Sequence, residues 1–144
     1  MRAFALALML AAFAFGAPAR AAEKPPVTLY KTATCGCCKG YAEHMKALGY
    51  PITVIDHADL STLKRRLGVE PRLESCHTMK IGSYVVEGHV PETTIARLLT
   101  EKPAIKGIAL PGMPLGTPGM SGPKEGPYIV EVIGTKKPTV FAVE

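Results

Sequence analysis

Hydrophobic and polar positions recur with two different periods along the chain, and each period predicts one kind of element. Residues 27–31 have the composition of a β-strand, and residues 52–55 form a second short strand. Between them, apolar side chains recur at spacings of three and four, which predicts a helix from Cys35 that ends at Gly49. The hydroxyls of residues 32–34 are expected to cap this helix.

A short basic helix is predicted next. Asp59 or Ser61 is a suitable N-cap, the helix runs to Leu67, and Gly68 ends it. The basic triplet at residues 64–66 is expected to form a solvated face of this helix.

A hairpin and a last helix follow. Residues 77–81 and 84–87 flank the dipeptide Gly82-Ser83, a two-residue hairpin signal, and Pro91 stands at the start of an amphipathic helix. The resulting order is β-α-β-α-β-β-α, with a cysteine cluster at the first strand-to-helix turn. This order predicts an α/β fold of thioredoxin-like arrangement.

The remaining residues depart from a minimal thioredoxin-like domain. Residues 107–127 are rich in glycine and proline and repeat the sequence Pro-Gly-Met at 111–113 and 118–120. Apolar segments bracket this stretch, so we expect an ordered loop laid back over the domain. Residues 128–133 and 139–143 predict a β-hairpin. We therefore divide the mature chain into a thioredoxin-like domain, residues 22–106, and an extension, residues 107–144, packed on it.

The first residues have the pattern of a secretory signal peptide. Arg2 precedes an apolar run over residues 3–15, and small residues then allow cleavage after Ala19 or Ala21. The run is too short to span a membrane as a helix. We expect residues 1–21 to be removed on export to the periplasm, leaving a chain that is not anchored in the membrane.

Charge excludes one class of function. The chain carries 17 basic and 12 acidic residues, and loss of Arg2 and Arg20 lowers the net charge from +5 to +3. The basic residues are mostly scattered and aromatic residues are few, which does not indicate a nucleic-acid surface.

We expect a single-core protein acting as a monomer.

The four cysteines are spaced unfavourably for structural disulfides, although export makes disulfides the default expectation. A bond between Cys35 and Cys38 closes only a short loop and is worth about 2 kcal/mol. Neighbouring Cys37 and Cys38 cannot pair without strain. Only a bond from this cluster to Cys76 would stabilise the fold substantially, by about 4 kcal/mol. The spacing favours a concentrated sulfur site instead.

Cys35-Gly36-Cys37-Cys38 contains both C-x-C and C-x-x-C spacing at a predicted helix start. The unpaired N–H groups and positive dipole end there favour thiolate over thiol. Thiolate is both the nucleophile and the metal ligand. Cys76 falls just before the third predicted strand, and in a thioredoxin-like fold that turn abuts the start of the first helix. The fold is therefore expected to bring the fourth sulfur to the other three.

The loop methionines and two histidines are further candidates. Met113 and Met120 follow no helical or strand period, and their thioethers suit Cu(I) in an oxidising compartment. The alternative is that they fill gaps beneath the loop. His77 and His89 could reach the site or orient a ligand. Met45 and Met79, by contrast, fit core positions and are expected there.

Several motifs in the same order resemble the periplasmic CopG-like family, a copper-resistance family distinct from the DNA-binding repressor of that name. The motifs are the segments 34–38, 75–78, 84–91, 107–113 and 118–120. The resemblance implies a thioredoxin-like domain whose C-terminal extension helps to bind copper, with a proposed role in interconverting Cu(I) and Cu(II). It implies that Cys35, Cys37, Cys38 and Cys76 are ligands and that Met113 and Met120 contribute.

Three functions are compatible with these residues. The first is a periplasmic copper-binding protein of copper resistance, holding Cu(I) as a polynuclear thiolate cluster and meeting other copper-handling proteins. The second is a thiol–disulfide oxidoreductase using Cys35 and Cys38, against which Cys37 counts as a competing nucleophile. The third is a structural zinc site, which gives no reason for the methionine loop. The first is preferred, and whether it is catalytic stays open.

Overall fold

The computed structural model describes residues 23–144. The predicted signal peptide, residues 1–21, lies outside the described residues. Within residues 23–144, no helix is both long enough and apolar enough to cross a membrane.

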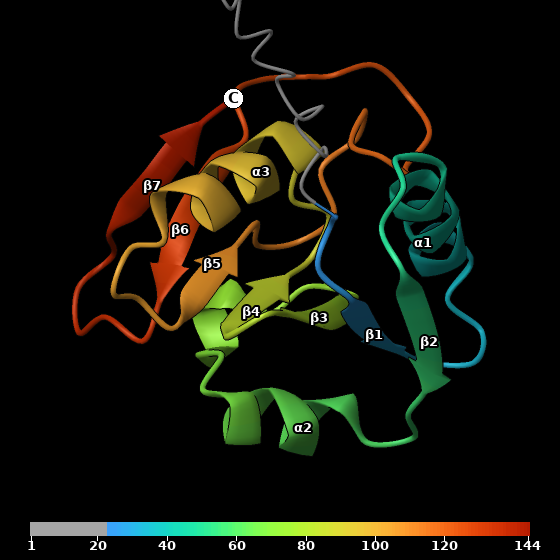
Figure 1. Ribbon diagram of the computed structural model, residues 1–144, viewed down its shortest axis with the longest axis horizontal. Helices are drawn as coiled ribbons and strands as arrows, with labels where there is room; N and C mark the ends of the chain where they lie inside the picture. The colour runs from blue at the N-terminus through green and yellow to red at the C-terminus, as the bar shows by residue number, and fades with distance from the viewer. Residues whose placement is uncertain (1–22) are drawn as a thin grey trace, which may run out of the picture.

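Over the described part of the chain, three helices, one 3₁₀ turn and seven strands follow one another. Figure 1 shows their arrangement. In order they are β1 (Val27–Lys31), α1 (Gly36–Ala47), β2 (Ile52–Asp56), α2 (Leu60–Leu67), η1 (Pro71–Leu73), β3 (His77–Ile81), β4 (Tyr84–Glu87), α3 (Glu92–Glu101), β5 (Gly107–Ala109), β6 (Ile129–Ile133) and β7 (Val140–Val143). The predicted α/β class and the predicted order of elements through α3 are confirmed. The two strands expected near the C-terminus are also present.

All seven strands form one sheet in the order β2-β1-β3-β4-β5-β6-β7. The pairs β1/β2 and β4/β5 are parallel, and the other neighbours are antiparallel. The sequence did not predict β5, which we expected to be part of the loop. Gly107 allows this strand to pair with β4, because a Cβ atom there would collide with the backbone of Val85. The C-terminal residues therefore continue the main sheet.

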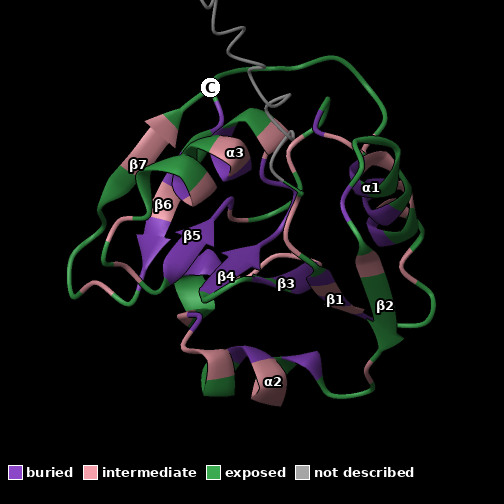
Figure 2. Cartoon of the chain, in the orientation of Figure 1, coloured by how far each residue is buried: buried purple, intermediate pink, exposed green. Residues whose placement is uncertain are grey.

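Helices cover both faces of the sheet. Side chains of α1 and α3, including Met45 and Leu98, share the larger core cluster with Met79 of β3. On the opposite face, Leu73 of η1 packs with Val85 in a smaller cluster. Figure 2 shows the central strands as mostly buried, the edge strand β2 as mostly exposed, and the other edge strand, β7, as exposed or partly exposed along its length. Met45 and Met79 are fully buried, as the sequence predicted.

Local signals account for the helix ends. The Asp59 carboxylate accepts a hydrogen bond from the Thr62 N–H at 2.9 Å, which caps α2, and Gly68 ends the helix with φ 76°. At the start of α1, however, the cap is the sulfur of Cys35 and not a threonine hydroxyl. The threonines lie before the N-cap position, in a turn in which the Thr32 carbonyl accepts a hydrogen bond from the Cys35 N–H.

Candidate metal centre

The first turn of α1 places three cysteines together. Cys35 Sγ accepts a hydrogen bond from the Cys38 N–H at 3.3 Å, and Cys35 and Cys38 are joined by a disulfide. Our expectation against disulfides is therefore wrong for this pair. The pair can form because the first turn of the helix brings the Cα atoms of Cys35 and Cys38 to 5.4 Å from each other, within the usual range for a disulfide. Because thiolates are the ligands, these two sulfurs become available to a metal by reduction.

Cys37 and Cys76 are free thiols that lie close to each other, one on α1 and the other before β3. Cys37 Sγ lies 3.5 Å from Cys35 Sγ and 3.9 Å from Cys76 Sγ. Cys76 precedes β3, and its carbonyl oxygen is 3.6 Å from Cys38 Sγ. All four sulfurs lie within 4.8 Å of one another. The fold thus brings Cys76 to the first three cysteines as predicted.

A buried ion pair holds the turn that carries Cys76. The Glu87 carboxylate accepts hydrogen bonds from the Ser75 N–H at 2.6 Å and from the Thr78 hydroxyl at 2.5 Å. Lys64 reaches from α2 to pair with Glu87, and it donates to the Ser75 carbonyl at 3.0 Å. The predicted solvated face is therefore wrong for Lys64, which is only 3% exposed. Its ammonium compensates the one carboxylate buried beneath this turn.

Two fully buried histidines adjoin Cys76. His89 Nε2 lies 2.9 Å from Cys76 Sγ, and His89 Nδ1 lies 2.7 Å from the Pro118 carbonyl oxygen. Since a carbonyl can only accept, Nδ1 carries the hydrogen, and the neutral ring presents the Nε2 lone pair to Cys76. His77 Nδ1 is 3.5 Å from the same sulfur. The sequence left both residues as open possibilities, and the structure places both at the site.

The aromatic ring of Tyr41 packs on the two imidazoles. Its centroid lies 4.7 Å from that of His77 and 5.2 Å from that of His89, and the two imidazole centroids are 4.8 Å apart. The Tyr41 hydroxyl donates to the Val90 carbonyl at 2.6 Å. This packing excludes water from the histidine side of the site.

Burial determines the protonation of these groups. It lowers the pKa of His77 well below its ordinary value, with smaller effects from the charges of His89 and Lys64. It also lowers the pKa of His89. Burial, followed by the proximity of Cys37, raises the pKa of Cys76 to about 12. At neutral pH the Cys76 S–H therefore donates to His89 Nε2, and binding of a metal at Cys76 must release a proton.

The Pro-Gly-Met repeats anchor the loop at both sides of the site. Gly112 forms a β-bridge with Ser75, and the Ser75 hydroxyl donates a hydrogen bond to the Gly112 carbonyl. Met113 is the next residue in the loop, and Ser75 precedes Cys76. The second repeat packs closely on α1, since a Cβ atom at Gly40 would lie 3.2 Å from Gly119 Cα. Met120 is the residue after this contact. The predicted ordered loop, laid back over the domain, is present.

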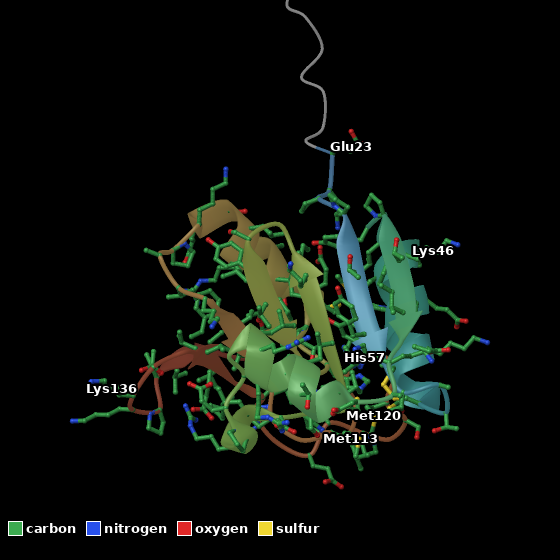
Figure 3. All side chains as sticks on the ribbon, turned by 90° about the horizontal axis from the view of Figure 1, so that it is seen from below. Glu23, Lys46, His57, Met113, Met120 and Lys136 are labelled. Carbon is green, nitrogen blue, oxygen red and sulfur yellow. A yellow bond between two sulfur atoms is a disulfide. The ribbon has the colours of Figure 1, made fainter. Side chains whose placement is uncertain are left out.

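The two methionines differ in exposure. Met113 is 55% exposed, whereas Met120 is partly buried. Figure 3 shows both on the same side of the molecule as the yellow disulfide bond. Met120 is therefore the more enclosed of the two candidate thioethers.

The donors form two overlapping groups. One contains Cys35, Cys37, Cys38 and Cys76, and the other contains Cys76, His77 and His89. Sulfur selects soft ions such as Cu(I), while imidazole suits copper and zinc alike. Cys76 belongs to both groups, so one thiolate there can serve two ions.

Two comparisons with known proteins found matches to this chain. Residues 73–120 match the family described as "Protein of unknown function, DUF411", and this segment contains Cys76, both buried histidines and both Pro-Gly-Met repeats. Two solved structures named "Copper resistance protein copG", Form 2 and Form 1, are each 38% identical to this chain. Each match covers 85% of this chain and 99% or 98% of the other, with TM-scores of 0.77 and 0.76. A search of curated proteins found no match.

Proposed function

The chain belongs to the CopG-like family of copper resistance proteins, and from this premise we propose that it binds Cu(I) through its cysteine cluster in the periplasm. The observation that carries the proposal is the convergence of four cysteine sulfurs, from segments far apart in sequence, within 4.8 Å. Met113 and Met120 supply further soft donors from the loop. Copper is preferred to zinc because the thioethers suit Cu(I) and have no role in a structural zinc site.

The proposed cluster forms when the Cys35–Cys38 disulfide is reduced. Four thiolates exceed the needs of a single ion, and thiolates this close can bridge ions. The cluster is therefore proposed to be polynuclear. A role in interconverting Cu(I) and Cu(II), and exchange of copper with other periplasmic proteins, belong to the same proposal.

We propose that the two parts of the chain contribute different ligands. Residues 22–106 supply the cysteines and histidines, and the extension at residues 107–144 supplies the methionine loop that closes over them. Export by residues 1–21 would place the protein in the periplasm as a monomer without a membrane anchor.

One observation favours a second function. The Cys35–Cys38 disulfide lies at a helix N-terminus and includes one partly exposed residue, Cys35, which suits a thiol–disulfide oxidoreductase. Cys37 Sγ, only 3.5 Å from Cys35 Sγ, would compete with an incoming substrate thiol. The oxidoreductase therefore remains the alternative.

Metal analysis of the reduced protein tests the proposal. The protein is reduced with a dithiol, desalted without oxygen and loaded with excess Cu(I), and bound copper and zinc are measured by mass spectrometry. We expect more than one copper per chain, falling by at least half in Cys76→Ser, because Cys76 belongs to both donor groups. Met120→Leu should weaken binding about tenfold, whereas the core variant Met79→Leu should not.

The same preparation separates the alternatives. Stoichiometric zinc with no copper would overturn the copper proposal. Rapid reduction of insulin disulfides by the metal-free protein, together with less than one copper per chain, would replace it with the oxidoreductase.

A further inference from the structure

Formation of the Cys35–Cys38 disulfide removes two sulfurs from the proposed cluster but leaves a second set of donors intact. Cys37 and Cys76 stay free in this state, and His89 lies against Cys76. The disulfide form is therefore not stripped of metal ligands.

The spacing of the two free sulfurs suits one shared ion. Two thiolates that bind one metal at about 2.3 Å, with tetrahedral or trigonal angles, lie about 3.8 to 4.0 Å apart. Cys37 Sγ and Cys76 Sγ are 3.9 Å apart in the disulfide form. Their separation needs no adjustment to accept an ion between them.

His89 is prepared as a third donor. Its Nδ1–H donates to the Pro118 carbonyl, so its Nε2 lone pair points to Cys76. The 2.9 Å between Nε2 and the sulfur is within reach of an S–H···N hydrogen bond. An ion in place of that proton, at about 2.3 Å from sulfur and about 2.0 Å from nitrogen, requires the two atoms to move apart. Nearby, His77 Nε2 is buried with no hydrogen-bond partner among the described residues, so a second imidazole nitrogen lies free beside Cys76.

We infer that the disulfide form holds one copper ion through Cys37, Cys76 and His89. The inference rests on the proposed function and adds that the state with the Cys35–Cys38 disulfide holds one copper ion, whereas the state with four thiols holds more than one. Cys76 is common to the reduced cluster and to this smaller site.

The double variant Cys35→Ser/Cys38→Ser tests this inference, since it keeps only the two free thiols. It is kept reduced and free of oxygen, titrated with Cu(I) against a chromogenic Cu(I) chelator, and titrated separately with Ag(I), which does not change oxidation state. We expect one ion per chain with either metal. The wild-type disulfide form, verified by a count of two free thiols, should also bind one.

Further substitutions in the double variant identify the ligands. Cys37→Ala should abolish stoichiometric binding, and His89→Gln should weaken it at least tenfold. His44→Gln, at the far end of α1 from the cysteines, is the matched control and should bind like its parent. Far-UV circular dichroism verifies that each variant is folded.

The possible failures are distinguishable. If reduced wild type binds several copper ions while the double variant and the disulfide form bind none, this inference is overturned and the proposed function stands. If His89→Gln binds as tightly as its parent, the assignment of His89 is wrong. If reduced wild type itself binds no copper, the proposed function fails.

Discussion

His77 is fully buried, and its burial, with smaller effects from His89 and Lys64, opposes a positive charge on the ring. Tyr41 packs on it from α1, Cys76 adjoins it in sequence, His89 faces it from beyond β4, and Lys64 approaches from α2. The ring therefore stays neutral in the folded chain at pH values where an exposed histidine is protonated. The cost of this arrangement appears in the pH dependence of stability.

We predict that the metal-free protein loses stability between pH 6.5 and pH 5. The unfolded chain takes up a proton on His77 as the pH falls below about 6.5, and the folded chain does not, because burial lowers the pKa of His77. The free energy of unfolding is therefore complete above pH 6.5 and falls below it by up to about 1.4 kcal/mol per pH unit. Urea unfolding at pH 7.5, 6.5 and 5.5 measures it.

His77→Phe removes this titration and should flatten the dependence, although the lowered pKa of His89 leaves a residual slope of the same sign. His44→Gln, in the last turn of α1, is the control and should keep the wild-type slope. An unchanged free energy of unfolding from pH 7.5 to 5.5 in the wild type would contradict the prediction.

At the scale of elements, the methionine loop is attached by its two Pro-Gly-Met turns. Gly112 and Gly119 both have left-handed backbones, with φ of 70° and 83°. Their surroundings differ, since a Cβ at Gly112 would meet nothing within 4 Å, whereas one at Gly119 would lie 2.5 Å from the Cys37 carbonyl oxygen. Only the second turn is pressed against α1.

Alanine at these two glycines should therefore have unequal effects. Gly112→Ala bears only the left-handed backbone penalty, about 1–2 kcal/mol. Gly119→Ala bears the same penalty and must also push the loop from α1, which adds about 1–3 kcal/mol. The free energy of unfolding, measured with denaturant, should rank them in that order, and copper affinity should fall more in Gly119→Ala.

Gly126→Ala is the matched control, because Gly126 has no positive φ and a Cβ there meets nothing within 4 Å. It should change the free energy of unfolding little. Equal losses for Gly112→Ala and Gly119→Ala would show that the contact with α1 does not support the loop.

At the scale of the whole molecule, the proposed boundary between residues 106 and 107 falls inside one continuous sheet. β5 joins β4 to β6, and Ile108 and Val130 are buried in the same cluster as Met79 of β3. The extension therefore shares the core of the first part and contributes to its stability.

We predict a single unfolding transition for the whole chain. Hydrogen exchange followed by mass spectrometry across a urea series should give the same midpoint for peptides covering β1 and β6, because their side chains share one core. Circular dichroism should follow the same curve. Loss of protection in residues 129–143 at clearly lower urea would instead show that the extension unfolds on its own.

Local patterns by themselves determined much of this protein. The periodicity of apolar residues predicted most helices and strands, Asp59 and Gly68 predicted the ends of α2, and the cysteine spacing predicted a sulfur site at a helix start. These features depend on neighbours within a few positions along the chain, where backbone geometry and hydrogen bonding repeat regularly.

Only the tertiary structure decided what meets across long stretches of sequence. The sequence predicts Lys64 on the surface, but in the fold Lys64 pairs with the buried Glu87. Residues 107–109 form a strand because β4 and β6 hydrogen-bond to them on both sides. The hydrogen bonds of His89 to Cys76 and to Pro118 join residues 13 and 29 positions apart. No periodicity records such contacts, because they arise from the packing of whole elements, and that packing sets the protonation and direction of each donor at the site.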